Sequence, residues 1–222
     1  MVVRMESLAD RTFAAVLFDN DGTLVDSTGS VTRSWVRWAQ EHDVDPRRLS
    51  GFHGVPAAAI IEAVAPEVDA EAAFARIEAL EIADVDDVVA LPGVLAAVAD
   101  LAGAPVAVAT SATRGLARVR LESAGIEIDE VVTIEDVERG KPAPDPFVEA
   151  ARRLGVAPEE CLVCEDAPSG IVAARAAGCA VLAVTTTSTA EELGDADLVV
   201  SSLADVVFEV VDGRVRVRPR QP

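Results

Sequence analysis

The chain alternates between short apolar runs and longer stretches in which apolar residues recur every three or four positions. Short apolar runs bounded by turn residues are typical of strands buried on both faces of a sheet, whereas the longer spacing is typical of helices. The predicted strands are 13–18, 105–109, 131–134, 161–164, 180–184 and 198–200. The predicted helices between them are 94–101, 115–124, 146–154 and 169–177, with Asp145 expected to cap the third. This alternation predicts a doubly wound α/β fold with a parallel sheet.

One long interval interrupts that alternation. Trp35 and Trp38 lie on one helical face, and the alanine-rich segments 56–64 and 70–82 are also helical in pattern, so no strand is expected between about 28 and 89. We expect the tryptophans to form the core of a small helical unit. The pair Pro92–Gly93 then breaks the pattern. We predict an α/β core made of residues 1–27 and 92–222, with a helical cap inserted at 28–91.

The C-terminal segment 206–217 contains Asp212–Gly213 between apolar flanks, which predicts a hairpin turn. Beyond the turn, arginines alternate with valine or proline. We interpret this pattern as a solvent-facing edge strand, in preference to a tail that binds nucleic acid.

Composition narrows the classes of partner. The chain has 19 Lys and Arg against 38 Asp and Glu, for a formal net charge of −19. Because phosphate backbones and anionic lipids are bound by basic surfaces, we expect neither nucleic acid nor a membrane as partner. Cys161 and Cys164 have redox-motif spacing but fall in a predicted strand, where residues three apart face opposite sides. We interpret them as buried structural cysteines and expect a cytoplasmic protein.

Two acids, Asp19 and Asp21, follow the first predicted strand directly and precede Gly22. In an extended chain they project to the same side, and carboxylates about 4 Å apart repel by roughly 4 kcal/mol at an effective dielectric of about 20. A fold tolerates this if a cation lies between them or if one of them keeps a proton. The alternative is that these aspartates only cap a turn.

Three more polar clusters follow predicted strands. Thr110–Ser111 at a strand-to-helix turn can cradle a phosphate, or can be ordinary loop residues. Lys141 lies between Gly140 and Pro142, so it is either a fixed phosphate-binding ammonium or an incidental surface lysine. Glu165–Asp166 can cap a helix or complete a magnesium site with Asp19. Because ligands bind beyond the carboxyl ends of parallel strands, the four clusters together favour phosphoryl transfer through an aspartyl phosphate.

These motifs resemble the haloacid dehalogenase (HAD) superfamily of phosphatases with a small helical cap. Asp19–Leu24 resembles the first motif, Thr110 the second, Lys141 the third and Glu165–Asp166 the fourth. The sequences around the last three are similar to those of glycerol-3-phosphate and 2-deoxyglucose-6-phosphate phosphatases. The cap segment Phe52–Pro56 resembles their His-Gly loop, although Val55 stands where relatives place a substrate-contacting residue.

The resemblance implies a role for each site residue. Asp19 is the expected nucleophile and Asp21 the acid and base, while Mg²⁺ binds Asp19, the Asp21 carbonyl, Asp166 and, nearby or through water, Glu165. Thr110 and Lys141 are expected to hold the phosphoryl group. The remaining expected substrate contacts are Ser111, Ala112, His53 and Gly54, although His53 can equally be a loop histidine bonded to the backbone.

The resemblance leads to one expected function and several alternatives. We expect a Mg²⁺-dependent phosphatase that acts on small sugar or polyol phosphates, as a monomer or weak homodimer. A sugar phosphomutase of the β-phosphoglucomutase type is the alternative, and a non-catalytic phospho-ligand binder is a third. A haloacid dehalogenase is a weaker alternative, because that chemistry does not need the Asp21 acid.

Asp26 and Ser27 lie where the chain leaves the core, so we expect a hinge or helix-capping role for them.

Overall fold

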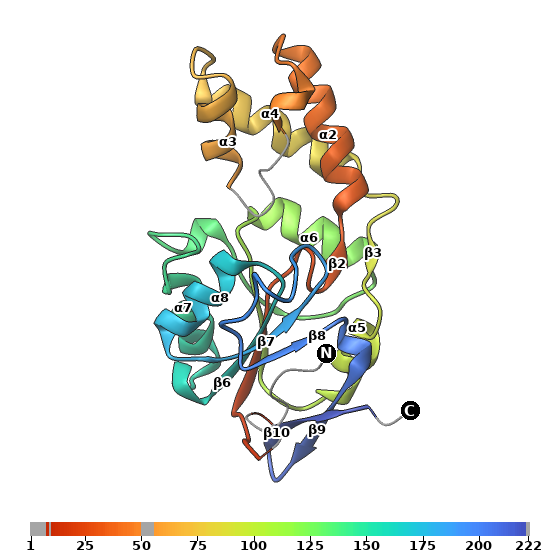
Figure 1. The fold of residues 1–222 in the computed structure, drawn as a ribbon, viewed down its shortest axis with the longest axis vertical. Coiled ribbons are helices and arrows are strands. Elements are labelled where there is room, and N and C mark those ends of the chain that lie inside the picture. The colour runs from red at the N-terminus through yellow and green to blue at the C-terminus, as the bar shows by residue number, and fades with distance from the viewer. Residues whose placement is uncertain (1–7, 9, 50–55, 221–222) are drawn as a thin grey trace.

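A parallel sheet of six strands, in the order β5-β4-β1-β6-β7-β8, forms the centre of the molecule (Figure 1). The computed structural model describes residues 8, 10–49 and 56–220. Every neighbouring pair in the sheet is parallel, which confirms the predicted fold class. The strands are β1 (Ala15–Phe18), β4 (Val106–Ala109), β5 (Glu130–Val132), β6 (Cys161–Glu165), β7 (Ala180–Val184) and β8 (Leu198–Val200).

Separate apolar clusters cover the two faces of the sheet, because successive residues of each strand point to opposite sides. The helices that flank the sheet are α5 (Val94–Asp100), α6 (Arg114–Ser123), α7 (Asp145–Leu154) and α8 (Pro168–Ala177). Leu17 packs in one cluster with Phe147 of α7, and Phe18 packs in the other with Val94 of α5. Cys161 and Cys164 likewise belong to different clusters, and both are free and buried, as predicted.

The helices α2 (Thr28–Glu41), α3 (Ala57–Val64) and α4 (Ala70–Ala83) pack around an apolar cluster of their own. Trp38 is fully buried in it and donates from Nε1 to the carbonyl of Ala73 at 2.9 Å, with Trp35 edge-on at 5.5 Å between ring centroids. Figure 1 shows these helices extending beyond the sheet on the side of α6. The helices agree with the sequence, whereas the boundary of the cap at 28–91 stays a prediction.

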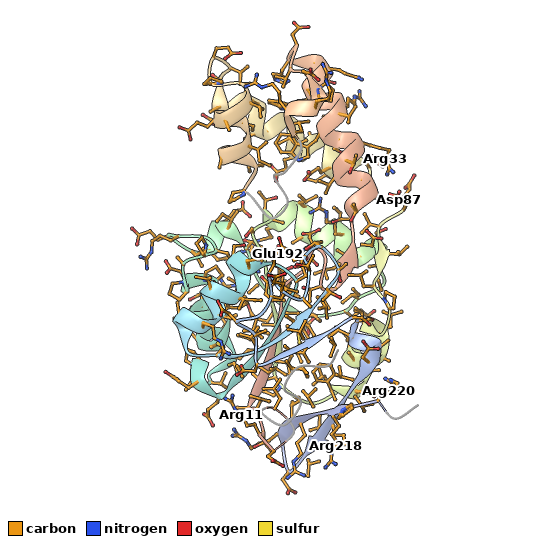
Figure 2. All side chains as sticks on the ribbon, viewed as in Figure 1. Arg11, Arg33, Asp87, Glu192, Arg218 and Arg220 are labelled. Carbon is orange, nitrogen blue, oxygen red and sulfur yellow. The ribbon has the colours of Figure 1, made fainter. Side chains whose placement is uncertain are left out.

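Short pairings lie between the sheet and the helices α2 to α4. β2 (Val25–Asp26) and β3 (Val89–Ala90) form an antiparallel ribbon there, so the expectation of no strand up to residue 89 was wrong at its end. A strand of two residues is too short to have a recognisable period. Arg33 of α2 also pairs with Asp84 and Asp87 beyond α4, and Figure 2 shows Arg33 close to Asp87.

The predicted hairpin turn is confirmed. Asp212 and Gly213 have φ of +52° and +74°, and they join β9 (Val206–Val211) to β10 (Arg214–Pro219). The hairpin forms a two-stranded sheet of its own, in which β10 is the arginine-bearing edge strand that the sequence predicts. Phe13 bridges to Val215, which anchors the hairpin below β1.

Two local boundaries differ from the sequence prediction. β5 ends at Val132, and Ile134 lies in a short 3₁₀ turn, because Asp136 accepts from the Thr133 amide and closes that turn. Asp145 is the first residue of α7 and does not cap it, since its carboxylate pairs with Arg139 at 2.8 Å. The 3₁₀ turns are η1 (Pro46–Leu49), η2 (Ile134–Asp136), η3 (Pro158–Glu160) and η4 (Leu203–Asp205).

Candidate active site

A buried lysine links two acids at the carboxyl ends of adjacent strands. Asp19 directly follows β1, and Glu165 is the last residue of β6. Lys141 Nζ donates to Asp19 Oδ1 at 2.5 Å and to Glu165 Oε1 at 2.7 Å, and it lies 4.9 Å from the centre of the Phe147 ring. Lys141 is only 8% exposed. It is therefore a fixed cation within an acidic cluster, and the alternative of an incidental surface lysine is excluded.

Glu165 is held by the start of the next helix. Its Oε2 accepts from the amides of Asp166 and Ala167 at 2.8 and 2.9 Å. The helix α8 approaches so closely that a Cβ added to Gly170 would lie 1.6 Å from Glu165 Oε1. Glycine at position 170 therefore leaves the space that the carboxylate needs to reach Lys141.

Asp166 lies beside the loop that follows Asp21. Its Oδ2 accepts a hydrogen bond from Thr187 Oγ1, and its Oδ1 accepts one from Thr23 Oγ1 at 3.5 Å. Gly22 has φ of +87°, and a Cβ there would lie 2.1 Å from Asp166 Oδ2. The turn after the first strand thus requires glycine for two reasons: its backbone conformation and its close approach to Asp166.

The acids together carry more negative charge than one lysine can neutralise. Oxygen atoms of Asp19, Glu165 and Asp166 lie within 4.8 Å of one another. Burial and the neighbouring carboxylates raise the pKa of Asp19 well above its usual range, although Lys141 opposes this shift. Burial and Glu165 raise the pKa of Asp166 to about 7. Such a buried, oxygen-only cluster fits a hard divalent cation, which would relieve the repulsion.

Asp21 has a different set of partners. Its Oδ1 accepts from Ser27 Oγ at 2.7 Å and pairs with Arg120 Nη1 at 2.8 Å, while Asn20 Nδ2 donates to Oδ2 at 3.2 Å. The sequence suggested two ways to reconcile Asp19 with Asp21, a shared cation or a retained proton. The structure adds a third solution, because each acid has a basic partner of its own. The hydroxyl of Ser27 contacts Asp21 and does not cap α2.

Arg120 was missed by the sequence analysis. It is 4% exposed on α6, and its Nη2 also reaches Glu81 Oε2 of α4 at 3.3 Å. Burial raises the pKa of Glu81 to about 7, with Arg120 acting in the opposite direction. The available signal was that each charge lies on the apolar face of its helix, Arg120 with Leu116 and Glu81 with Ile77.

The predicted phosphate loop follows β4. Thr110 is buried, its amide donates to the carbonyl of Val132, and its Oγ1 accepts from the Ala112 amide at 3.1 Å. Ser111 is exposed and Ala112 half-buried. This arrangement fixes the turn and leaves Ser111 at the surface. The other two predicted substrate contacts, His53 and Gly54, lie outside the described residues.

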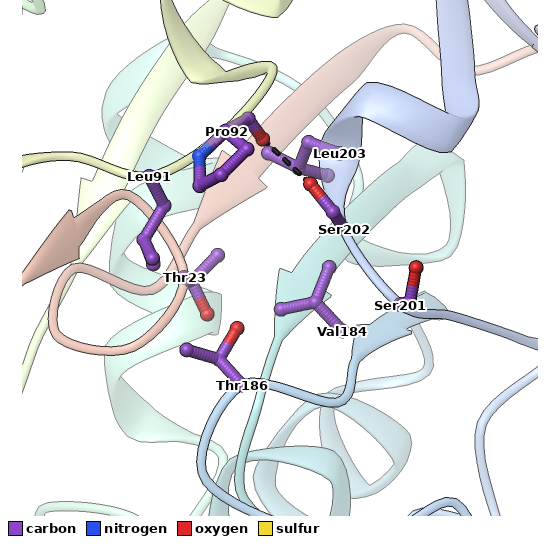
Figure 3. Close-up of a pocket in the computed structure, with 8 residues that line it drawn as sticks. All are labelled: Thr23, Leu91, Pro92, Val184, Thr186, Ser201, Ser202 and Leu203. Carbon is purple, nitrogen blue, oxygen red and sulfur yellow. Dashed lines mark hydrogen bonds between the residues drawn. The ribbon is translucent and has the colours of Figure 1, made fainter.

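A cavity of about 150 Å³ lies next to this region (Figure 3). Thr23 lines it, and the Ser202 hydroxyl donates to the carbonyl of Pro92 at its rim, at 2.7 Å. Among the described residues, its lining includes no member of the acidic cluster and no residue of the predicted phosphate loop. The cavity is therefore distinct from the predicted site.

Comparison with known proteins agrees with this geometry. The profile of the family "Haloacid dehalogenase-like hydrolase" matches residues 16–184. Hexitol phosphatase A of Escherichia coli (strain K12) is 43% identical over 197 residues, covering 86% of this chain and 91% of that protein. Validoxylamine A 7'-phosphate phosphatase of Streptomyces hygroscopicus subsp. limoneus is 37% identical over 211 residues, covering 87% and 96%. The chain belongs to the haloacid dehalogenase-like hydrolases, and it is an enzyme of the phosphoric monoester hydrolase class.

A solved structure supports the fold independently. The β-phosphoglucomutase of Clostridium difficile superposes with a TM-score of 0.76 at 21% identity, covering 86% of this chain and 92% of that one. At that identity the likeness concerns the fold alone. Within the described part of the chain, no helix is both long and apolar enough to cross a membrane.

Proposed function

We propose that this enzyme is a Mg²⁺-dependent phosphatase that hydrolyses small sugar or polyol phosphates through an aspartyl phosphate on Asp19. The observation that carries the proposal is the buried cluster in which Lys141 contacts both Asp19 and Glu165, beside Asp166. The relatives named for hexitol phosphate and validoxylamine phosphate support a polyhydroxylated substrate.

In the first step, a carboxylate oxygen of Asp19 attacks phosphorus and the bond from phosphorus to the alcohol oxygen breaks. Asp21 donates its proton to that leaving oxygen, so the product departs as a neutral alcohol. Lys141, together with the hydroxyl and amides around Thr110, is suited to neutralise the phosphoryl oxygens. Ser111 and Ala112, and in the cap His53 and Gly54, remain proposed substrate contacts.

The acidic cluster needs a partner of opposite charge before it can accept a phosphate dianion. Asp19, Asp166 and the Asp21 carbonyl are the proposed ligands of Mg²⁺, and Glu165 acts nearby or through water. When bound, the ion supplies positive charge that neutralises both the carboxylates and the phosphoryl group. Glu165 contacts Lys141 and two backbone amides, which favours an indirect role in which Glu165 orients the lysine.

In the second step, water attacks the phosphorus of the aspartyl phosphate and the bond from phosphorus to Asp19 breaks. The Asp21 carboxylate takes the proton of that water, which restores both acids and releases inorganic phosphate. A phosphomutase would instead return the phosphoryl group to a sugar. Its support here is a similarity of fold at 21% identity, whereas the relatives at 43% and 37% identity are named phosphatases.

The test is a phosphate-release screen over sugar, polyol and nucleotide monophosphates with Mg²⁺. We expect turnover of sugar or polyol phosphates, reversible loss with EDTA, and a loss of at least about 1,000-fold in Asp19→Asn, because an amide cannot attack phosphorus. Asp100→Asn, at an exposed aspartate of α5, is the matched control and should keep full activity. Appreciable turnover by Asp19→Asn would contradict the proposal, and isomerisation of a hexose 1-phosphate without phosphate release would favour the mutase.

A further inference from the structure

The carboxylate of Asp21 is oriented by groups from three segments. Asn20 is its neighbour in the chain, Ser27 precedes the first cap helix, and Arg120 comes from α6. Of these donors only Arg120 carries a charge. It lies 99 positions along the chain from Asp21 (120 − 21), so tertiary folding alone creates the contact.

Arg120 is also the point where α4 of the cap reaches the site. Its Nη2 contacts Glu81 at 3.3 Å, while Nη1 contacts Asp21 at 2.8 Å. Among the described residues, no group forms a hydrogen bond with its Nε. A buried guanidinium with a donor left unpaired is unfavourable for stability, so packing alone does not explain an arginine on this apolar face.

A second contact joins the same two helices. Thr113, which caps α6, donates to Glu78 of α4, one helical turn before Glu81. Thr113 and Arg120 are seven residues apart, so they lie on the same face of α6. The helix α4 thus meets α6 at one point beside the predicted phosphate loop and at another beside Asp21.

We propose, on the basis of the proposed function, that Arg120 is a positioning residue for Asp21 and that Glu81 holds Arg120 in place. Cap and core then orient the proton-transferring carboxylate together. Arg120 touches neither phosphorus nor the leaving oxygen in this scheme. Its effect passes entirely through the direction in which Asp21 points.

This role has a signature that a purely structural role lacks. Alkyl phosphates need a proton on the leaving oxygen, whereas p-nitrophenolate leaves without one. The ratio kcat/KM covers the reaction only up to departure of the alcohol, so it isolates that step. A misdirected Asp21 should therefore impair an alkyl ester much more than p-nitrophenyl phosphate.

The experiment measures kcat/KM for mannitol 1-phosphate and p-nitrophenyl phosphate with Mg²⁺. In Arg120→Met we expect a loss of about 30-fold or more for the alkyl ester and less than about 3-fold for the aryl ester. Arg120→Lys should restore part of the alkyl activity, and Glu81→Gln should change the ratio in the same direction by a smaller factor. Arg118→Met, at an exposed arginine of the same helix, is the matched control and should change neither ester.

Equal losses for both esters in Arg120→Met, or no loss, would overturn the positioning role. If Arg120→Met does not fold, the ester ratios of Arg120→Lys and Glu81→Gln decide, since an unchanged ratio in both contradicts the proposal. Failure of the wild-type enzyme to hydrolyse any monoester would instead overturn the proposed function, so the two failures are distinguishable.

Discussion

At the scale of single residues, Asp19 and Asp21 are neighbours in sequence but have different surroundings. Asp19 contacts the buried Lys141, and Asp21 contacts Arg120 and the hydroxyl of Ser27. Two acids can take different roles when their environments differ. The separate partners are consistent with the different roles proposed for the two acids, Asp19 as nucleophile and Asp21 as acid and base.

Gly170 is predicted to be essential to this arrangement. A Cβ at this position would lie 1.6 Å from Glu165 Oε1, so Gly170→Ala must displace the carboxylate that orients Lys141. We expect a loss of kcat/KM of at least about 10-fold and a lower melting temperature, consistent with overpacking that costs about 1–3 kcal/mol. Steady-state kinetics and thermal unfolding measure the two effects.

Gly115 provides the comparison for that substitution. It lies on α6, and within the described part of the chain an added Cβ would meet only Ile82, at an ordinary 3.5 Å. Gly115→Ala should leave activity unchanged and raise stability by up to about 1 kcal/mol, because alanine favours the helix. Equal behaviour of the two variants would refute the argument from close approach.

At the scale of elements, the helices α2, α3 and α4 have their own apolar cluster, and α4 contacts α6 of the core through the polar side chains of Glu78 and Glu81. An element with its own core can open locally at a free energy below that of global unfolding. The polar contacts of Thr113 and Arg120 with α4 then fix the position of these helices relative to the site. The division into core and cap is consistent with this packing and can be tested directly.

Trp38→Ala is the substitution for that test. Trp38 is fully buried, bonds to Ala73 and packs against Trp35, so its truncation should cost about 3–5 kcal/mol within the cap. We expect limited proteolysis to cut first within 28–91, while the remainder stays folded. The control Val148→Ala, at an exposed side chain of α7, should leave the cleavage pattern unchanged. Uniform cleavage along the chain would argue against a separate cap.

At the scale of the whole molecule, excess negative charge dominates, with a formal net charge of −19. Part of it is buried, in the cluster of Asp19, Glu165 and Asp166. Self-repulsion and buried carboxylates both oppose the folded state when these groups ionise. Stability should therefore depend on pH and on divalent cations together.

The sign of the pH dependence follows from the raised pKa values. Burial brings the pKa of Asp166 and of Glu81 to about 7, from ordinary values of 3.8 and 4.5. At pH values between the ordinary pKa and the raised pKa of these groups, the folded state binds more protons than the unfolded state. The free energy of unfolding therefore falls as pH rises through this range. In EDTA we expect a higher melting temperature near about pH 5.5 than near about pH 8.

Mg²⁺ should raise the melting temperature most at the higher pH, because its ligands must be ionised to bind. Asp166→Asn should weaken both the pH slope and the Mg²⁺ effect, whereas Asp100→Asn should keep them. Below about pH 4.5 the trend reverses, because carboxylates with lowered pKa values, such as Glu149 beside Arg152 and Arg153, lose their ion pairs on protonation. A melting temperature in EDTA that rises from pH 5.5 to pH 8 would contradict this account.

The order of the core strands and helices, the parallel sheet and the proximity of Asp19, Lys141 and Asp166 could be predicted from the chain. Those features depend on local periodicity and on the rule that strand ends share one edge, and both can be recognised from the chain. Only the folded structure shows that Arg120 pairs with Asp21 and Glu81, that Gly170 makes room for Glu165, and that the hairpin forms a sheet of its own. These features depend on which helices and strands, distant in sequence, pack against one another. A helical pattern can indicate a buried charge, but it does not indicate which residue pairs with that charge.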